Sequence, residues 1–395
     1  MASSSTKAAG TKSILTPTIT LKGHGDGIHS ISYFPDDQRM ISGSRDKTTR
    51  QWEVKAGKEI EKARGVCEEE VYAVAVSRNS RWVATGGGDG IHRAELKVCE
   101  VETGIVQTFE GHSERISCID ISADNTWLAS GSWDETARIW NMDTGKLVAG
   151  PFKTKDPVGA VRFSPDSKKL AVMSLWGTVT PVFWTNDNKN ILAAFSFTKD
   201  DLRTIYEFDA STLETVGTPF KGHTEHITDL ALSFDHALLA SASLDDNTIK
   251  LWVFESRQLL ASFDVQNIYR LVLSTDSRQL AYTVVDTKDD TKIYICDVPP
   301  DVLAQARSIA RTTANLDRLL HSHATRLPAG HRKPPIHGIP TVQRPPPSND
   351  LQQPSFLRLG KFLRFSPRTN SVRPGRKDQS RDPLDVFPRY ITPTF

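Results

Sequence analysis

The chain has 395 residues, of which 38% are hydrophobic and 24% are charged, and its formal net charge is +2. This length allows two or three ordinary domains, or one large β-architecture with appendages. No apolar run of about 18 residues occurs, and residues 1–20 lack the apolar centre of a secretory signal. The four cysteines form no CxxC pair, which disfavours a disulfide scaffold and a zinc finger and predicts an intracellular location, cytoplasmic or nuclear.

Charge is divided unevenly along the chain. Residues 1–300 contain 33 basic and 41 acidic side chains, whereas residues 301–395 contain 16 basic and 6 acidic ones. The second part also holds 13 of the 22 prolines, and all eight tryptophans lie between Trp52 and Trp252. This division predicts a globular body followed by a basic, proline-rich tail.

Three segments of the body are similar to one another. Each begins with Gly-His and ends with Trp: GHGDGIHSISYFPDDQRMISGSRDKTTRQW ends at Trp52, GHSERISCIDISADNTWLASGSWDETARIW at Trp140, and GHTEHITDLALSFDHALLASASLDDNTIKLW at Trp252. The spacing from His to Trp is the same in the first two and one position longer in the third. Within each segment, short runs of alternating apolar residues are separated by turns that contain Asp. A period of two is typical of half-buried strands, and regular repetition indicates a repeat architecture.

These segments resemble the WD40 repeat, each of which forms one four-stranded blade of a β-propeller. The resemblance covers roughly residues 17–298, which predicts a propeller domain at 17–300, and implies an all-β ring on which other proteins assemble. The repeats also resemble WD40 proteins that are expanded in mushroom-forming fungi. The family's blades contain a network of four polar side chains. The residues that match this network are His24, Ser42, Asp46 and Trp52, then His112, Ser130, Asp134 and Trp140, and then His223, Ser241, Asp246 and Trp252.

The residue types of this network suit a closed set of hydrogen bonds. The indole of Trp only donates, the carboxylate of Asp only accepts, and Ser and His do both, so every member can be satisfied inside a blade. Ser, His and Asp are also the residues of a catalytic triad. Their recurrence in three repeats favours the structural role over the catalytic one.

The spacing of the Gly-His pairs sets the expected number of blades. The interval from His24 to His112 fits two repeats and places Cys99 where the second repeat would carry Trp. The interval from His112 to His223 is too short for three full repeats. The run DPVGAVRFSPDSKKLAVMSL predicts two strands of a fourth blade that lacks its outer two, and a fifth blade follows with Phe208 at the Trp position. We expect seven blades with the fourth truncated; six blades, with the fourth and fifth merged, is the alternative.

The two ends of the ring are expected to meet in its last blade. That blade has Cys296 at the Trp position and no fourth strand after it, and the extended run PTITLKGH at residues 17–24 would complete it. Residues 1–16 are expected to be disordered. The truncated blade is expected to leave an unpaired strand edge near residues 170–182, which is either a folding liability, the reading we favour, or a binding edge for an added strand.

Enzyme motifs are absent from the sequence. It contains no GxxxxGK[ST] and no GxSxG, and the GGGDG run at residues 86–90 fits a turn between strands. Cys99 and Cys296 are expected to be core residues rather than nucleophiles. We therefore expect no catalytic residues, no cofactor and no metal.

The resemblance implies that a partner protein binds at the central opening, beside the starts of the inner strands. The flanking residues there include His29, Glu70, Ser117 and Asn267. The candidate partner-binding residues are Arg45, Tyr72, Arg115, Trp133, His226 and Tyr269. Trp133 is the most suggestive, because an exposed aromatic side chain in an Asp turn is a typical anchor for binding.

The tail contains two informative segments. Apolar residues recur with a helical period over residues 301–326, which predicts a helix, either docked on the propeller or free, and residues 327–395 are expected to be disordered. A basic amphipathic segment at 356–365 would bind an anionic membrane or an acidic protein and fold as it binds, unless its spacing is chance. Its candidate residues are Phe356, Arg358, Lys361, Phe362, Arg364 and Phe365.

The sequence thus predicts a non-catalytic WD40 scaffold that binds partner proteins and forms a monomeric ring. A peripheral membrane adaptor, tethered through the tail segment, is the alternative, and a propeller hydrolase is the least favoured. Nucleic acid is not an expected partner, because the basic charge of the tail is spread over the whole of 301–395 with few aromatic residues between.

Overall fold

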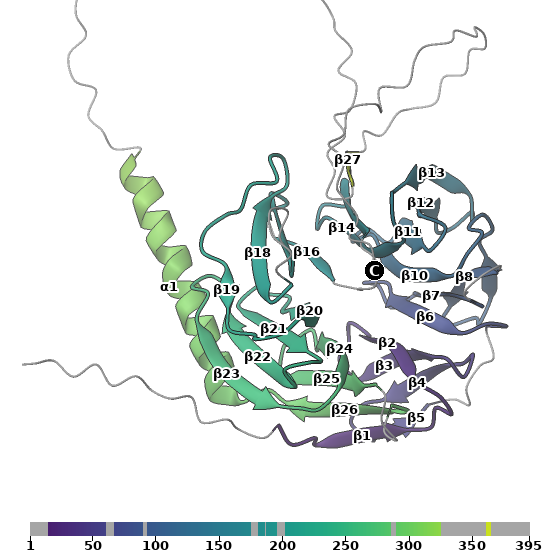
Figure 1. Cartoon of the computed structure of the whole chain (residues 1–395), viewed down its shortest axis with the longest axis horizontal. Helices are drawn as coiled ribbons and strands as arrows, with labels where there is room; N and C mark the ends of the chain where they lie inside the picture. The colour runs from purple at the N-terminus through teal and green to yellow at the C-terminus, as the bar shows by residue number, and fades with distance from the viewer. Residues whose placement is uncertain are drawn as a thin grey trace, which may run out of the picture. The chain divides into compact units, whose positions relative to one another are not determined.

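A computed structural model describes residues 15–60, 67–89, 93–174, 181–185, 187–195, 202–285, 290–324 and 361–364. The strands among these residues form seven antiparallel sheets, six with four strands and one with three, and one α-helix lies between β26 and β27 in the chain (Figure 1). Five of the sheets each use four consecutive strands. An all-β fold with a single helix is the arrangement that the alternating apolar runs predict.

The five sheets that are each built from four consecutive strands lie between Ile28 and Asp264. They consist of β2 (Ile28–Tyr33), β3 (Arg39–Ser44), β4 (Thr49–Glu53) and β5 (Lys58–Glu59); β6 (Val71–Val76), β7 (Trp82–Gly88), β8 (Ala94–Glu100) and β9 (Val106–Thr108); β10 (Ile116–Ile121), β11 (Trp127–Ser132), β12 (Thr136–Asn141) and β13 (Leu147–Lys153); β16 (Val182–Trp184), β17 (Asn190–Ala193), β18 (Thr204–Asp209) and β19 (Phe220–Lys221); and β20 (Ile227–Leu232), β21 (Leu238–Ser243), β22 (Thr248–Val253) and β23 (Leu259–Asp264).

Strand register aligns the third strands of the blades. Three tryptophans lie opposite apolar residues of the second strand, in the pairs Met40 with Trp52, Leu128 with Trp140, and Leu239 with Trp252. The same register places Cys99 opposite Val83, Phe208 opposite Ile191, and Cys296 opposite Leu280. The prediction that Cys99, Phe208 and Cys296 stand at the Trp position is confirmed.

The chain closes on itself in the sheet that contains both early and late residues. It consists of β1 (Ile19–Lys22), β26 (Lys292–Asp297), β25 (Gln279–Val284) and β24 (Ile268–Leu273), in that order. Thr20 of β1 lies opposite Tyr294 of β26. The prediction that the N-terminal strand completes the last blade is confirmed, and this pairing covers an edge that would otherwise be open.

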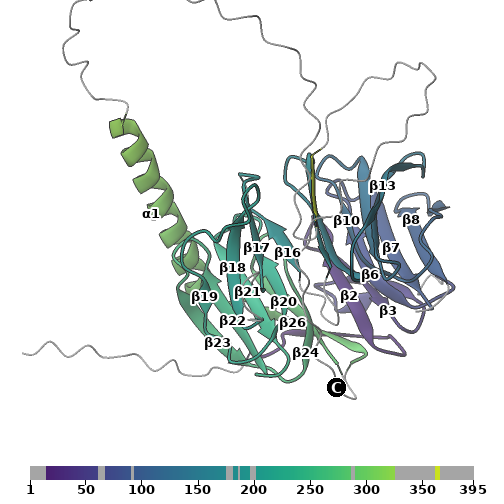
Figure 2. The ribbon, with the colours of Figure 1, turned by 45° about the horizontal axis from the view of Figure 1, so that its top comes forward.

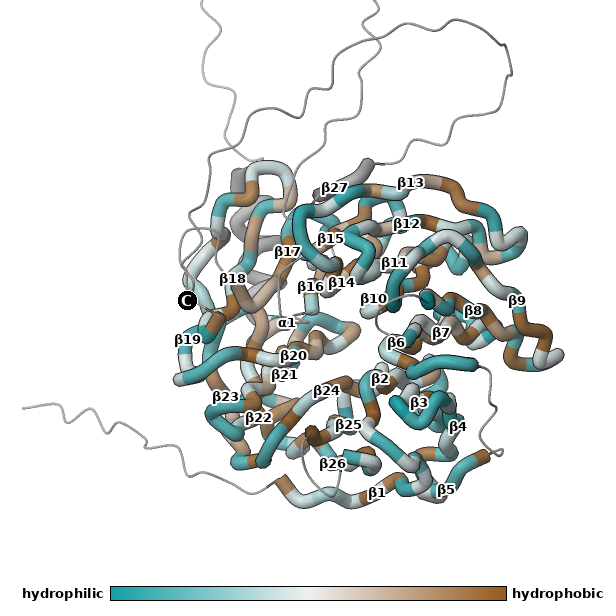
Figure 3. The backbone as a smooth tube through the Cα atoms, turned by 45° about the vertical axis from the view of Figure 1, so that its right-hand side comes forward, coloured by the Kyte–Doolittle hydropathy of each residue, from teal (hydrophilic) through white to brown (hydrophobic). Residues whose placement is uncertain are grey.

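The innermost strands of the seven sheets surround one cavity of about 310 Å³. They are β2, β6, β10, β14, β16, β20 and β24, and residues of each line it. Figure 3 shows the backbone by hydropathy, with hydrophobic residues recurring along strands such as β8, β17 and β24. Because each sheet packs both faces against its neighbours, the second strands are almost completely buried; all six residues of β21 are buried.

The fourth sheet in chain order differs from the others. It contains β14 (Val158–Phe163), β15 (Lys169–Ser174) and β27 (Lys361–Arg364), a short strand from the tail. The expectation of an unpaired edge at residues 170–182 is wrong for β15, because Leu170 lies opposite Leu363 in an antiparallel ladder. Residues 175–180 lie outside the described part of the chain.

The helix α1 (Pro300–Ala324) follows the last blade and docks on the sheet of β21, β22 and β23 (Figure 2). Val302, Leu303 and Ala306 are buried in one cluster with Leu15. Of the two options for the predicted helix, docking is therefore the one observed. The expectation that residues 1–16 are disordered is wrong at Leu15, which is only 8% exposed because it packs against this cluster.

Small residues on the second strands set the spacing between blades. At Gly131 an added Cβ atom would lie 2.4 Å from Cγ1 of Val158 and 2.6 Å from Sγ of Cys118. At the equivalent register position of the sixth sheet, opposite Asp229, the chain carries Ala242. Close approach of the next inner strand therefore requires glycine at the first position and tolerates a methyl group at the second.

We expect Gly131→Val to destabilise the folded chain by about 1–3 kcal/mol, because the added atoms overpack the contact with β14. Ala242→Gly serves as the control and is expected to cost no more than about 1 kcal/mol. Chemical unfolding of the two variants measures both effects. An equal or smaller loss for Gly131→Val would contradict the packing argument.

Candidate functional site

The three sets of polar residues are hydrogen bonded as closed networks within their blades. In the third sheet, Nδ1 of His112 lies 2.8 Å from Oδ2 of Asp134, and Nε2 of the same ring lies 2.8 Å from Oγ of Ser130. The hydroxyl oxygen of Ser130 accepts a hydrogen bond from Nε1 of Trp140 at 2.8 Å. Because Asp only accepts, the neutral imidazole carries its proton on Nδ1. Thr136, which the repeats did not single out, also donates to Asp134 at 2.6 Å.

The other two networks repeat this geometry. His24 lies 2.8 Å from Asp46 and 2.7 Å from Ser42, and Trp52 donates to Ser42 at 2.8 Å. His223 lies 2.8 Å from Asp246 and 2.7 Å from Ser241, and Trp252 donates to Ser241 at 2.9 Å. In all three blades the Ser hydroxyl faces a buried indole, so the arrangement is that of a structural network.

Protonation equilibria agree with a neutral His beside an ionised Asp. Burial lowers the pKa of His112 and of His223, although their Asp partners act in the opposite direction. Burial opposes ionisation of Asp134, but hydrogen bonds and the attraction of His112 outweigh it and lower the pKa of that carboxyl to about 2. The network thus holds the uncharged His and the charged Asp over the physiological pH range.

A second group of side chains gathers where the inner strands begin. We call it the aromatic–arginine cluster, and its members are His29, Tyr72, Arg115, Trp133, Tyr269 and Arg270. They come from β2, β6, β24, the residue before β10 and the loop between β11 and β12. Tyr72 and Arg270 also line the central cavity, so the cluster lies at one mouth of that cavity.

Contacts run through the cluster without a break. The guanidinium carbon of Arg115 lies 3.3 Å from the ring centroid of Trp133 and 4.6 Å from that of Tyr72. The rings of Tyr72 and His29 stack at 4.6 Å, and Nδ1 of His29 lies 3.1 Å from the hydroxyl of Tyr269. Cation–π contacts and stacking of this kind fix the rotamers of all five residues before any partner binds.

The cluster combines a rigid base with an exposed edge. Trp133 is 37% exposed, and its backbone N–H donates to the carbonyl of Arg115 at 3.0 Å, which anchors the loop. Arg270 donates from Nε to the carbonyl of His29 at 2.7 Å and lies 4.6 Å from the ring of Tyr269. Trp133 is thus the exposed member, whereas Tyr72, Arg115, Tyr269 and Arg270 are half-buried. Trp, Tyr and Arg are the residue types that dominate protein interfaces.

The remaining candidates lie beside the cluster or apart from it. The side chain of Arg45 is 52% exposed and lies 3.7 Å from Glu70, which accepts a hydrogen bond from Tyr72. His226 is exposed immediately before β20 and outside the contacts described above. In the tail, Lys361, Phe362 and Arg364 belong to β27, so this part of the segment is a strand rather than a helix. Phe356, Arg358 and Phe365 lie outside the described residues.

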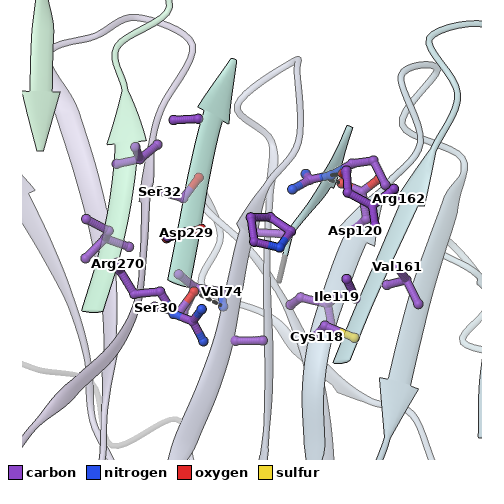
Figure 4. Close-up of a pocket in the computed structure, with 18 of the residues that line it drawn as sticks. Ser30, Ser32, Val74, Cys118, Ile119, Asp120, Val161, Arg162, Asp229 and Arg270 are labelled. Atoms are coloured by element: carbon purple, nitrogen blue, oxygen red, sulfur yellow. Dashed lines mark hydrogen bonds and ion pairs between the residues drawn. The ribbon is translucent and has the colours of Figure 1, made fainter. Parts of the chain in front are cut away.

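Sequence reasoning placed no charged residues inside the cavity, yet four lie there. Figure 4 shows Arg162 next to Asp120, on the side of the cavity away from Asp229 and Arg270. Asp120 accepts from Arg162 at 3.1 Å and from the backbone N–H of Phe163 at 2.7 Å. The sequence did contain a sign of these residues, because Asp120 interrupts the apolar strand ISCIDI and Asp229 interrupts ITDLAL.

The carboxylates of Asp120 and Asp229 each link two neighbouring blades. Asp229 accepts from the backbone N–H of Leu230 at 2.9 Å and from that of Leu271, on the next inner strand, at 2.7 Å. Burial raises the pKa of Asp229 to about 6, against the opposing effect of Arg270, and burial likewise raises the pKa of Asp120. Their oxygens are engaged by backbone donors, which assigns them to holding the inner strands in register.

The cysteines at the Trp position differ in environment. Cys296 is fully buried, and burial raises the pKa of its thiol to about 12. Cys99 is half-buried, and its Sγ lies 3.6 Å from the carbonyl of Glu100. At neutral pH the Cys296 thiol is protonated, which agrees with its predicted place in the core.

Acid is expected to weaken the fold through the cluster. Burial, followed by the positive charges of Arg270, Arg45 and Arg115, lowers the pKa of His29 to about 3 against a smaller opposing effect of Asp26. In the unfolded chain the same group binds a proton near pH 6.5. The unfolded state therefore binds more protons below about pH 6.5, and stability falls as the pH falls through this window.

His29→Phe keeps the stacked ring and removes the titration. Between about pH 6.5 and 4.5 we expect the unfolding free energy of this variant to depend less steeply on pH, by up to about 1.4 kcal/mol per pH unit. Urea unfolding of both chains across this range measures the two slopes. Parallel slopes would show that His29 is not neutral in the folded state.

The sheets and their polar networks identify the type of repeat in this chain. Seven sheets around one cavity, with a Trp–Ser–His–Asp network in three of them, are the features of a β-propeller built from repeats. A family model described as "WD domain, G-beta repeat" matches residues 15–53, 63–93, 104–141 and 213–253. The chain thus contains WD40 repeats at these positions, and the prediction of an all-β WD40 propeller is confirmed.

Curated relatives match parts of the chain. "Periodic tryptophan protein 2" of Saccharomyces cerevisiae is 26% identical over 287 residues, covering 62% of this chain and 30% of the relative. "Guanine nucleotide-binding protein subunit beta" of Oryza sativa is 33% identical over 128 residues, covering 31% of this chain and 34% of the relative. The match thus spans about a third of the length of these two relatives.

Solved structures match the fold over a larger share of the chain. "Crystal structure of RRP9 WD40 repeats" has a TM-score of 0.58 at 18% identity and covers 72% of this chain and 100% of that one. "Structure of U3-55K" has a TM-score of 0.57 at 18% identity and covers 71% and 98%. At this level of identity, the likeness shows the fold alone.

Proposed function

We propose that this chain is a non-catalytic scaffold that binds a partner protein through the aromatic–arginine cluster. The observation that carries the proposal is the contact between Trp133 and Arg115, continued through Tyr72 to the mouth of the cavity. A pre-ordered surface of Trp, Tyr and Arg loses little conformational entropy when a partner binds. One relative is described as a subunit, which agrees with a role in an assembly.

The ring has a proposed residue range and a proposed number of blades. We infer a seven-bladed ring over residues 17–300, with the fourth blade truncated after its second strand, then a docked helix and a tail from 327 to 395. The support is one cavity lined by the inner strands of seven sheets, six of which have four strands. We further propose a monomeric ring that acts in the cytoplasm or nucleus and needs no cofactor.

Other functions are less well supported. A hydrolase would need carboxylates free to act in the cavity, but Asp120 and Asp229 are engaged by backbone N–H groups. A membrane adaptor would need the tail segment free for lipid, but Lys361–Arg364 pair with β15. Among the described helices, none is long and apolar enough to cross a membrane.

A comparison of variants tests the proposed surface. Phe234, 65% exposed in the turn between β20 and β21, lies at the opposite end of the strands from the cluster and provides a matched control. Tagged wild-type, Trp133→Ala and Phe234→Ala chains would be purified from the native cell type with their partners. We expect Trp133→Ala to lose the partners that Phe234→Ala retains. Equal recovery by all three chains would refute the assignment of binding to this cluster.

A further inference from the structure

The strand β15 has the character of an interior strand. Leu170, Ala171, Val172 and Met173 are each 4% exposed or less. The outermost strands of other sheets are different: β9 and β23 carry large apolar side chains that are exposed, such as Val106 at 43% and Leu259 at 41%. A strand buried on both faces, with no charge or proline in this run, is a poor sheet edge, because its free backbone groups invite pairing.

Among the described residues, no strand lies between β15, which ends at Ser174, and β16, which begins at Val182. The strand β16 is already the first strand of the next sheet. The preceding sheet is different. Between Ser132, where its second strand ends, and Val158, where the next inner strand begins, the chain forms β12 and β13. By comparison, the interval from Ser174 to Val182 is far shorter.

The tail supplies the missing strand in antiparallel register. Lys361 lies opposite Val172, Phe362 opposite Ala171, Leu363 opposite Leu170 and Arg364 opposite Lys169. The connection is long enough, because the chain from 325 to 360, which joins α1 to β27, has an extended reach on the order of 100 Å at ~3.3 Å per residue. The third-strand position that the local sequence leaves open is thus occupied from within the same chain.

We propose that the edge of β15 is a docking site for an extended peptide strand, and that residues 361–364 occupy it as a cis-acting cover of the truncated blade. The recognition is β-strand addition, in which backbone hydrogen bonds provide the affinity. A four-residue strand offers few such bonds and is held mainly by its tether, which keeps its local concentration high. The cover is therefore removable, and a competing strand gains the edge when the tail leaves it. This site is separate from the aromatic–arginine cluster.

Hydrogen exchange in the full-length chain tests the cover. Proline cannot donate to a ladder and does not fit the middle of a strand, and successive residues point their backbone groups in opposite directions. We therefore use Phe362→Pro and Leu363→Pro, with Ser371→Pro, beyond the end of β27, as the matched control. We expect the amides of β15 that face β27 to exchange at least tenfold faster in one or both strand variants. Ser371→Pro should leave them unchanged, and β21 should stay protected in all chains.

A synthetic peptide of residues 356–367 tests the docking site itself. Added in excess to the Leu363→Pro chain, it should restore protection of β15, because the edge would accept the same strand in trans. Unchanged exchange in both proline variants would overturn the cover. Failure of the peptide to restore protection would overturn the docking site. Wild-type protection that falls on dilution, as a dimer dissociates, would place the strand in a second copy and overturn the cis assignment.

Discussion

Trp140→Ala is expected to destabilise the folded chain by about 3–5 kcal/mol. The side chain is 2% exposed and lies edge-on to Phe109, with ring centroids 6.0 Å apart. Its removal leaves a cavity between strands and takes away the donor to Ser130. Both the lost packing and the lost hydrogen bond weaken the same blade.

Two controls separate these contributions. Trp140→Phe keeps most of the ring volume and removes only the indole N–H, so we expect a smaller loss of about 1–2 kcal/mol. Trp133→Ala changes an exposed residue of the same blade and should alter stability by less than about 1 kcal/mol. Chemical unfolding followed by circular dichroism measures all three. Similar losses for Trp140→Ala and Trp133→Ala would contradict the assignment of Trp140 to the core.

His112→Phe is expected to cost about 2–4 kcal/mol, because it leaves two partners of a buried network without their hydrogen bond. Asp134 would keep Thr136 and the backbone N–H of Ser113 but would lose its contact with the ring, and Ser130 would lose the acceptor for its hydroxyl. The new side chain fills the space but offers no polar atom. The loss therefore measures the network rather than the volume.

A double-mutant cycle shows whether the network acts as a unit. With Asp134→Ala as the second change, we expect the combined loss to fall short of the sum by at least about 1 kcal/mol, since each single variant already breaks the shared contact. Unfolding free energies of wild type, both single variants and the double variant complete the cycle. Losses that add up within about 0.5 kcal/mol, as those of independent sites do, would contradict the coupling.

The repeated features of the fold could be predicted because equivalent positions can be aligned from one repeat to the next. Spacing from Gly-His to Trp aligned Ser130 with Ser42. Comparison with the complete repeats placed Cys296 at the Trp position, where the structure pairs it with Leu280. The strand at β1 was predictable because the last repeat lacked a fourth strand and the first was preceded by an extended run. In these cases the missing piece was defined by a complete copy elsewhere in the chain.

Features without a second copy were missed. The pairing of β27 with β15 joins segments that are far apart in the sequence, and a strand as short as β27 carries too little alternation to be recognised. Leu15, near the start of the chain, is buried by the helix that follows the last blade. Such contacts depend on tertiary structure, which local patterns do not contain.

The candidate surface was predicted in part. Tyr72, Arg115 and Tyr269 were marked because they flank the starts of inner strands, and they do lie together. Arg270 was missed although it is the next residue in the chain, because the bond from its Nε to the carbonyl of His29 spans two blades. His226 was marked by the same rule but lies on a blade that the cluster does not include.

Site-specific photo-crosslinking shows where a partner protein touches the propeller. A photoreactive residue would replace Arg45, whose side chain is 52% exposed beside the cluster, or Phe234, which is 65% exposed at the other end of the strands. We expect a partner protein to crosslink at position 45 and not at position 234, in full-length chains expressed in the native cell type. Crosslinking only at position 234, or equally at both, would contradict recognition through the aromatic–arginine cluster.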